Sequence, residues 1–264
     1  RHPRITVLLV ELHEAAQRSD STLTVIRTRE DFDAFLRRRS TNPRLVAGLL
    51  AIEGLHALEG KLANVDTLYA AGFRMMGLTH FFDNELGGSA HGVSRTGLTP
   101  FGRDVVRRME DLGITVDLAH ASDATKDDVL AMASRPVVVS HGGVAATCPG
   151  PRNLTDAQLT AIARNGGLVG IGYWDGAVCE MTVASIVRAM EHAAAIMGAD
   201  HVALGSDFDG ATIEPWDTRA LALITEGLMK AGFVPDDVRR MMGGNVREFL
   251  LRQLPSADGE QQAP

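Results

Sequence analysis

From residue 45 onward, short apolar runs alternate with amphipathic stretches along the chain. The runs expected to form strands are residues 45–52, 73–79, 114–119, 136–140, 168–173 and 201–206. Most of them are continuous in Val, Ile, Leu, Ala and Gly, which is typical of parallel strands covered on both faces. The pattern therefore predicts an α/β fold with right-handed crossovers, in which the parallel sheet is either open and doubly wound or closed into a barrel.

The stretches between these runs carry the end signals of helices. Thr99 precedes a proline and begins one helix, which Gly113 ends. A capping box at 155–158 begins a second helix that stops at Gly166, and residues 182–198 form a third. Strand and helix signals thus alternate regularly.

The two ends of the chain follow a different pattern. Residues 1–44 suggest a helix at 5–17, a short β run at 23–27 and a charged helix at 31–39. The last long helix is expected to begin at Pro235. We expect one barrel domain over residues 1–254, incomplete at its N-terminus, followed by a polar tail at 255–264.

Composition narrows the classes of protein that fit. The 264 residues are 45% hydrophobic and 22% charged, which excludes a disordered or fibrous chain. The net charge is −7 and no basic block stands out, which argues against a nucleic-acid partner. The longest apolar run, 45–52, is too short for a membrane helix.

Side chains that bind metals follow five of the six predicted strands. They are Glu53, His80, His120, His141 and Asp207. The carboxyl ends of strands in a parallel barrel converge on one face, where such enzymes place their chemistry. Imidazole nitrogens and a carboxylate suit Zn²⁺ better than Ca²⁺ or Mg²⁺. The sequence therefore predicts a metallohydrolase.

Six motifs in order resemble the membrane (renal) dipeptidase family of the amidohydrolase superfamily. They are IEGLH at 52–56, LTH at 78–80, DLAHAS at 117–122, SH at 140–141, RN at 152–153 and GSDFDG at 205–210. The resemblance extends from about residue 45 to about residue 250. It implies a TIM-type (β/α)8 barrel and a dipeptidase in which a hydroxide bridging two zinc ions attacks the peptide bond.

The resemblance also implies roles for single residues in metal binding. Glu53 matches the carboxylate that bridges the two zinc ions, and His120 and His141 match the ligands of the second zinc. Family members hold the first zinc with a His-x-Asp pair, but no histidine of this chain has an Asp two residues later. One metal site is therefore recognisable where the family has two.

The resemblance also implies which residues bind the substrate and transfer the proton. His80 matches a histidine that polarises the scissile carbonyl, and Arg152 matches the group that holds the free carboxylate of the dipeptide. Asp207 matches the acid/base that moves the proton, although Asp209 in the same loop is an alternative. Without the resemblance, Arg152 could equally be a surface cation.

The family also has two strands before the strand that ends at Glu53, and residues 1–44 show no convincing equivalent. We expect that this chain begins after those two strands. A natural variant with one metal or none is the alternative. Other functions left open are hydrolysis of acylated amino acids, and a non-catalytic remnant that binds a ligand.

Several other residues are not expected to have a catalytic role. His56 and His91 lie near the same face but are not expected to be ligands, and His2, His13, His192 and His201 are expected to be exposed or structural. Asp83 and residues 173–175 lie on strand-end loops and line the pocket or, for the aromatic residues, the core.

Cys148 and Cys179 fall close to the positions of a disulfide in extracellular members of the family. The alternative is two unpaired buried thiols, which suits a cytoplasmic protein. We favour a cytoplasmic location unless these cysteines are bonded, in which case export is expected. Family members often pair, so a homodimer is also an expectation.

Overall fold

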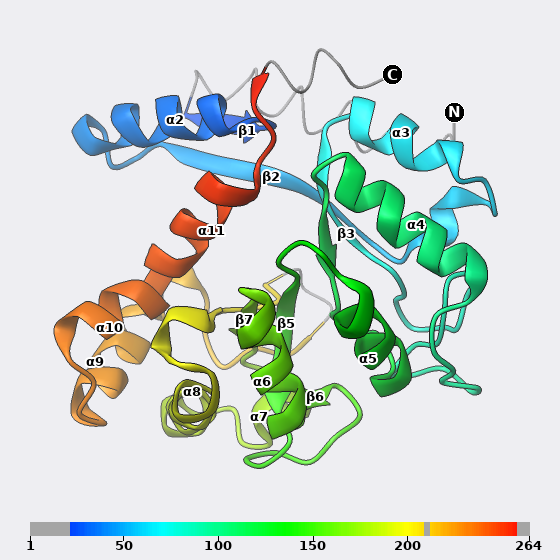
Figure 1. Cartoon of the computed structure of the whole chain (residues 1–264). Helices are drawn as coiled ribbons and strands as arrows, with labels where there is room; N and C mark the ends of the chain where they lie inside the picture. Colours follow the sequence, from blue (N-terminus) through cyan, green and yellow to red (C-terminus); the bar gives the residue numbers. More distant parts are fainter. Residues whose placement is uncertain (1–21, 209–211, 258–264) are drawn as a thin grey trace.

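A single parallel sheet organises the computed structural model, which describes residues 22–208 and 212–257 (Figure 1). The strand order is β1-β2-β3-β4-β5-β7-β8, and the short strand β6 pairs with β5. The strands are β1 (Leu23–Ile26), β2 (Val46–Glu53), β3 (Phe73–Gly77), β4 (Thr115–Asp117), β5 (Val138–Val144), β6 (Asn153–Leu154), β7 (Leu168–Ile171) and β8 (Val202–Leu204). All six predicted strands are therefore present.

Strand β1 corrects one expectation from the sequence. It pairs in parallel with β2, with Leu23 opposite Val46, so the first 44 residues do contribute a strand before the one that ends at Glu53. The strand is only four residues long and mostly half-buried, and so lacks the continuous apolar pattern of a central strand. The sheet curves like a TIM barrel, but among the described residues β8 and β1 do not pair.

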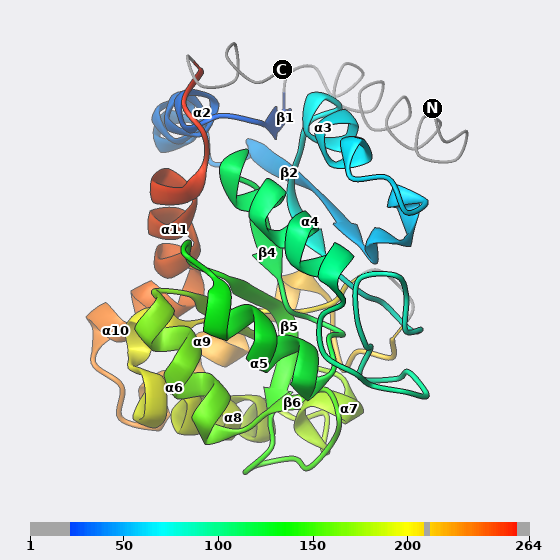
Figure 2. The same ribbon diagram turned by 45° about the vertical axis from the view of Figure 1, so that its right-hand side comes forward.

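Helices connect the strands and cover the outer side of the sheet (Figure 2). They are α2 (Arg29–Thr41), α3 (Ala63–Ala70), α4 (Pro100–Asp111), α5 (Asp123–Met132), α6 (Asp156–Asn165), α7 (Asp175–Val178), α8 (Val183–Met197), α9 (Ala222–Lys230), α10 (Pro235–Arg239) and α11 (Asn245–Gln253). The predicted caps are present: the Thr99 side chain accepts the N–H of Gly102, and Thr155 forms a capping box. Gly166 ends α6 with φ at 80°.

The long helix expected from Pro235 is interrupted. A π-helical turn, η4 (Arg240–Gly244), separates α10 from α11, and Gly243 has φ at 132°. A glycine pair at this point allows the bend, because the left-handed region is open to glycine. Asn245 then donates hydrogen bonds to the carbonyls of Ala199 and Val202, which fixes α11 beside the start of β8.

The core lies between the sheet and its helices. A second, smaller apolar cluster contains Ile26, Phe32 and Leu254, and so joins α2 to the end of α11, as Figure 1 shows. In the described part of the chain, no helix has the length and apolar character needed to cross a membrane. The helix predicted at 5–17 lies outside the described residues.

Candidate metal centre and substrate site

Three predicted ligands meet at the carboxyl ends of their strands. Glu53 is the last residue of β2, His120 follows β4, and His141 lies within β5. The Oε1 atom of Glu53 lies 3.5 Å from Nε2 of His120 and 3.4 Å from Nε2 of His141, and the two nitrogens are 3.0 Å apart. Within the described ranges these residues form a group that could hold a metal ion.

The spacing of these three atoms suits a small tetrahedral cation. Zn²⁺ holds nitrogen and oxygen ligands at about 2.0–2.1 Å, which places neighbouring ligand atoms of a tetrahedron about 3.3 Å apart. The observed separations lie close to that value, so the three atoms could together hold one such ion.

Buried hydrogen bonds position the two histidines. One oxygen of the buried Asp117 accepts the N–H groups of Ala119, at 3.0 Å, and Ser140, at 2.9 Å. These residues precede His120 and His141, so a single carboxylate ties the ends of β4 and β5 together. Ser140 Oγ also lies 2.9 Å from Nδ1 of His141, which orients the ring. His120 has φ at 63°, a strained conformation common at functional sites.

The charge states of Glu53 and His120 favour a cation. Burial lowers the pKa of His120 to about 4, so its ring is neutral near pH 7 and a nitrogen lone pair is available. Hydrogen bonding to His120, with the nearby rings of His141 and His80, lowers the pKa of Glu53 to about 2 despite partial burial. The group therefore presents the negative charge of Glu53 beside the neutral ring of His120.

His80 lies on the other side of the same carboxylate. Its Nε2 is 3.7 Å from Oε2 of Glu53, and its ring centroid is 4.4 Å from that of His120. Burial is the main cause that lowers the pKa of His80. The structure thus brings His80 next to the three ligands, as predicted.

Arg152 lies at the rim of this group rather than on the outer surface. Its guanidinium is 5.6 Å above the ring of Trp174, and Nη1 is 3.4 Å from Nε2 of His91. Its Nη2 is buried and has no hydrogen-bond partner among the described residues. Burial lowers the pKa of Arg152, and the charge of Asp207 is the strongest of those opposing this shift. The reading of Arg152 as a surface cation is therefore wrong.

Asp207 follows β8, as expected from the sequence, with φ at 61°. The negative charge of Asp207 raises the pKa of Arg152 and so opposes the effect of burial. The alternative residue, Asp209, lies outside the described residues.

Comparison with known proteins decides the family. The model of the membrane dipeptidase family, peptidase family M19, matches residues 7–258. The chain belongs to this family. As a member of it, the chain is a metallo-dipeptidase, and the fold class predicted from the sequence is confirmed.

Individual M19 relatives are similar over most of this chain. Dipeptidase verJ of Clonostachys rogersoniana is 31% identical over 212 residues, which is 78% of this chain and 55% of that protein. A solved M19 structure, the metallopeptidase dipeptidase AC, superposes with a TM-score of 0.84 at 27% identity, covering 95% of this chain and 77% of its own. The metallopeptidase of Rhodobacter sphaeroides, solved with a phosphinate mimic of L-Ala-D-Ala, gives 0.79 at 28% identity, covering 92% and 72%.

His91 has no role in the expectations from the sequence, yet it contacts Arg152. Trp174, expected to line the pocket or the core, is buried with its ring 5.7 Å from that of His141. The loop that carries His91 is held by Asp83, whose carboxylate accepts the N–H groups of Ser89 and Ser94. No periodic signal marks a contact between two loops, so the sequence could not show it.

His192 and His201 fit the expectation of exposed or structural residues. His192 pairs with Asp156 at 2.7 Å on the surface, and His201 Nδ1 is 2.8 Å from the carbonyl oxygen of Gly167. His2 and His13 lie outside the described residues.

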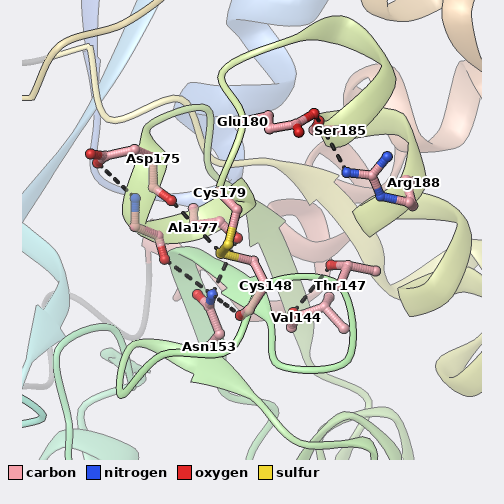
Figure 3. The surroundings of a disulfide bond; sticks show 11 residues. Val144, Thr147, Cys148, Asn153, Asp175, Ala177, Cys179, Glu180, Ser185 and Arg188 are labelled. Carbon is pink, nitrogen blue, oxygen red and sulfur yellow. Dashed lines mark hydrogen bonds between the residues drawn. A yellow bond between two sulfur atoms is a disulfide. The ribbon is translucent and has the colours of Figure 1, made fainter.

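Cys148 and Cys179 form a disulfide, with their Cα atoms 5.5 Å apart (Figure 3). The alternative of two unpaired thiols is therefore wrong. The bond joins the loop after β5 to the end of α7. Beside it, the amide nitrogen of Asn153 donates to the carbonyl oxygens of Cys148, Gly176 and Ala177. Together these contacts fasten the segment that carries Arg152 to the one that carries Trp174.

We expect removal of this bond to cost both stability and substrate affinity. Replacing Cys148 and Cys179 with Ala frees a loop of 31 residues in the unfolded chain, which lowers the free energy of unfolding by about 2–4 kcal/mol. KM should rise because Arg152 is less firmly held. Thermal unfolding followed by circular dichroism measures the first effect, with reduced wild-type protein as the control. An unchanged melting temperature in both samples would contradict this prediction.

Proposed function

We propose that the chain is a zinc-dependent dipeptidase whose metal is held by Glu53, His120 and His141. The observation that carries the proposal is the buried, unpaired Nη2 of Arg152 on the same face as these ligands. A buried guanidinium nitrogen without a partner is costly unless a ligand satisfies it. The free carboxylate of a dipeptide is such a ligand, because the planar fork of Arg binds carboxylates through two hydrogen bonds.

The metal would supply Lewis-acid chemistry at the scissile carbonyl and make water a stronger nucleophile at neutral pH. Residues of the chain would position the substrate and transfer the proton. His80 donates a hydrogen bond to the carbonyl oxygen as negative charge develops there. Asp207 takes the proton of the attacking water and delivers it to the leaving amine. Arg152 fixes the distance between the carboxylate and the bond to be cut, which restricts the substrate to dipeptides.

Three further expectations accompany this proposal. Among the described residues only one set of metal ligands is found, so we propose one zinc at Glu53, His120 and His141 without assigning a second. The Cys148–Cys179 disulfide supports a location in an oxidising compartment rather than the cytoplasm. Formation of a homodimer stays a prediction.

The proposal is tested with three classes of substrate. Zinc-loaded protein is incubated with dipeptides, the same dipeptides amidated at the C-terminus, and N-acetyl amino acids, and released amino acids are quantified. We expect hydrolysis of dipeptides, with amides at least tenfold poorer in kcat/KM. Preference for N-acetyl amino acids would instead identify an acylase, and no hydrolysis at all would favour a ligand-binding protein.

Arg152→Ala should raise KM for dipeptides by roughly 30- to 100-fold, since it removes a charge-assisted bidentate contact. The amidated dipeptides should be little affected, because they lack the carboxylate. Arg188→Ala is the matched control, since Arg188 lies on α8 and hydrogen-bonds Ser185. Equal effects of Arg152→Ala on both classes would argue against the carboxylate contact.

A further inference from the structure

The aromatic side chain of Phe81 lies beside the proposed metal site and takes no part in the proposed reaction. Phe81 follows His80, and its ring centroid lies 4.2 Å from that of His80 and 5.6 Å from that of His120. The ring centroid is also 5.3 Å from that of His91. Phe81 is nevertheless 48% exposed. One part of the ring therefore packs on imidazoles of the site while another part faces solvent.

Exposed apolar residues are common on protein surfaces, so exposure alone carries little weight. Phe81 differs from Phe82, the next residue, which is 80% exposed. Phe81 contacts three rings of the site, so its exposed surface forms part of the wall of that site. Covering such a surface with an apolar ligand group is favourable, at roughly 25 cal/mol per Å².

The contacts of Phe81 also indicate which part of a substrate would lie against it. Its ring is next to both His80, which is assigned to the scissile carbonyl, and His91, whose Nε2 is 3.4 Å from Nη1 of Arg152. A dipeptide whose scissile carbonyl is bound by His80 and whose free carboxylate is bound by Arg152 has its C-terminal residue between these two side chains. The side chain of that residue would then be the substrate group that can contact Phe81.

We propose that Phe81 is a specificity-determining residue that selects dipeptides with an apolar side chain at the C-terminal residue. The inference rests on the proposed function, because it uses the substrate orientation set by His80 and Arg152. The phenyl ring provides no hydrogen-bonding group for a polar side chain, so a polar residue at this position would lose water without gaining a partner.

The test compares substrate pairs that differ at one residue. The ratio of kcat/KM for Ala-Leu over Ala-Ser reports the C-terminal residue, and Leu-Ala over Ser-Ala reports the N-terminal one. We expect the wild type to favour Ala-Leu over Ala-Ser by roughly tenfold or more, the scale that an apolar contact of this size provides. Phe81→Ala should remove most of this preference, mainly by raising KM for Ala-Leu.

Two variants keep the test specific. Phe81→Leu retains an apolar wall and should retain most of the preference, whereas Phe82→Ala should leave the wild-type ratio in place. An unchanged ratio in Phe81→Ala would overturn the inference, as would an equal loss in Phe82→Ala or a loss confined to the Leu-Ala and Ser-Ala pair. If the wild type hydrolyses no dipeptide, the proposed function fails and this inference fails with it; active wild type with an unaltered Phe81→Ala ratio overturns the inference alone.

Discussion

Replacing His120 with Asn is expected to abolish binding of the proposed metal and to lower kcat/KM for dipeptides by about a thousandfold or more. His120 supplies one of three candidate ligand atoms in the group with Glu53 and His141. A catalytic zinc site holds its ion with three protein ligands, so the loss of one leaves too few. Activation of water and polarisation of the carbonyl are lost together with the ion.

Metal content by mass spectrometry and kcat/KM measured on the same samples check this expectation. His192→Asn is the matched control, because His192 is a histidine that pairs with Asp156 on the surface, away from the three ligands. Full metal content and activity in His120→Asn would contradict the assignment. The wild-type sample also reports the number of ions per chain, for which the described residues supply one set of ligands.

The structure brings the predicted site residues together because each lies at or near the carboxyl end of a strand. Continuous apolar runs identified the six central strands, and the residue after each run is the one that a parallel sheet directs to a common edge. Local signals also identified the helix ends, since the capping oxygen of Thr155 satisfies a backbone group only three residues away.

Features that depend on distant pairing were beyond such local signals. The short β run at 23–27 was predicted and is present as β1, but its pairing with β2 was not predicted, because its four residues lack the apolar pattern of a central strand. The contact between His91 and Arg152 joins two loops whose conformation is set by side chains such as Asp83. The disulfide was indicated only by resemblance, because cysteine positions alone do not show that two Cα atoms come within bonding range.

Asp207→Asn is expected to lower kcat for dipeptides by about 10²- to 10⁴-fold, the range that one positioned acid or base contributes. Asn has nearly the same shape and tolerates the left-handed conformation that Asp207 adopts, at φ 61°, so the fold should be retained. What the variant loses is a group that can accept a proton from water and return it to the leaving amine. KM should change less than kcat, because Arg152 still holds the substrate carboxylate.

Steady-state kinetics on Ala-Leu, with circular dichroism to confirm folding, separate this role from a structural one. Asp209→Asn is the matched control, since Asp209 is the alternative acid in the same loop. A large loss in Asp207→Asn with near-normal turnover in Asp209→Asn assigns the proton transfer to Asp207, whose charge already acts on Arg152 across the site. The reverse result would assign the proton transfer to Asp209 and leave Asp207 as a charge partner of Arg152. Turnover is expected to fall most when the carboxylate that carries the proton becomes an amide.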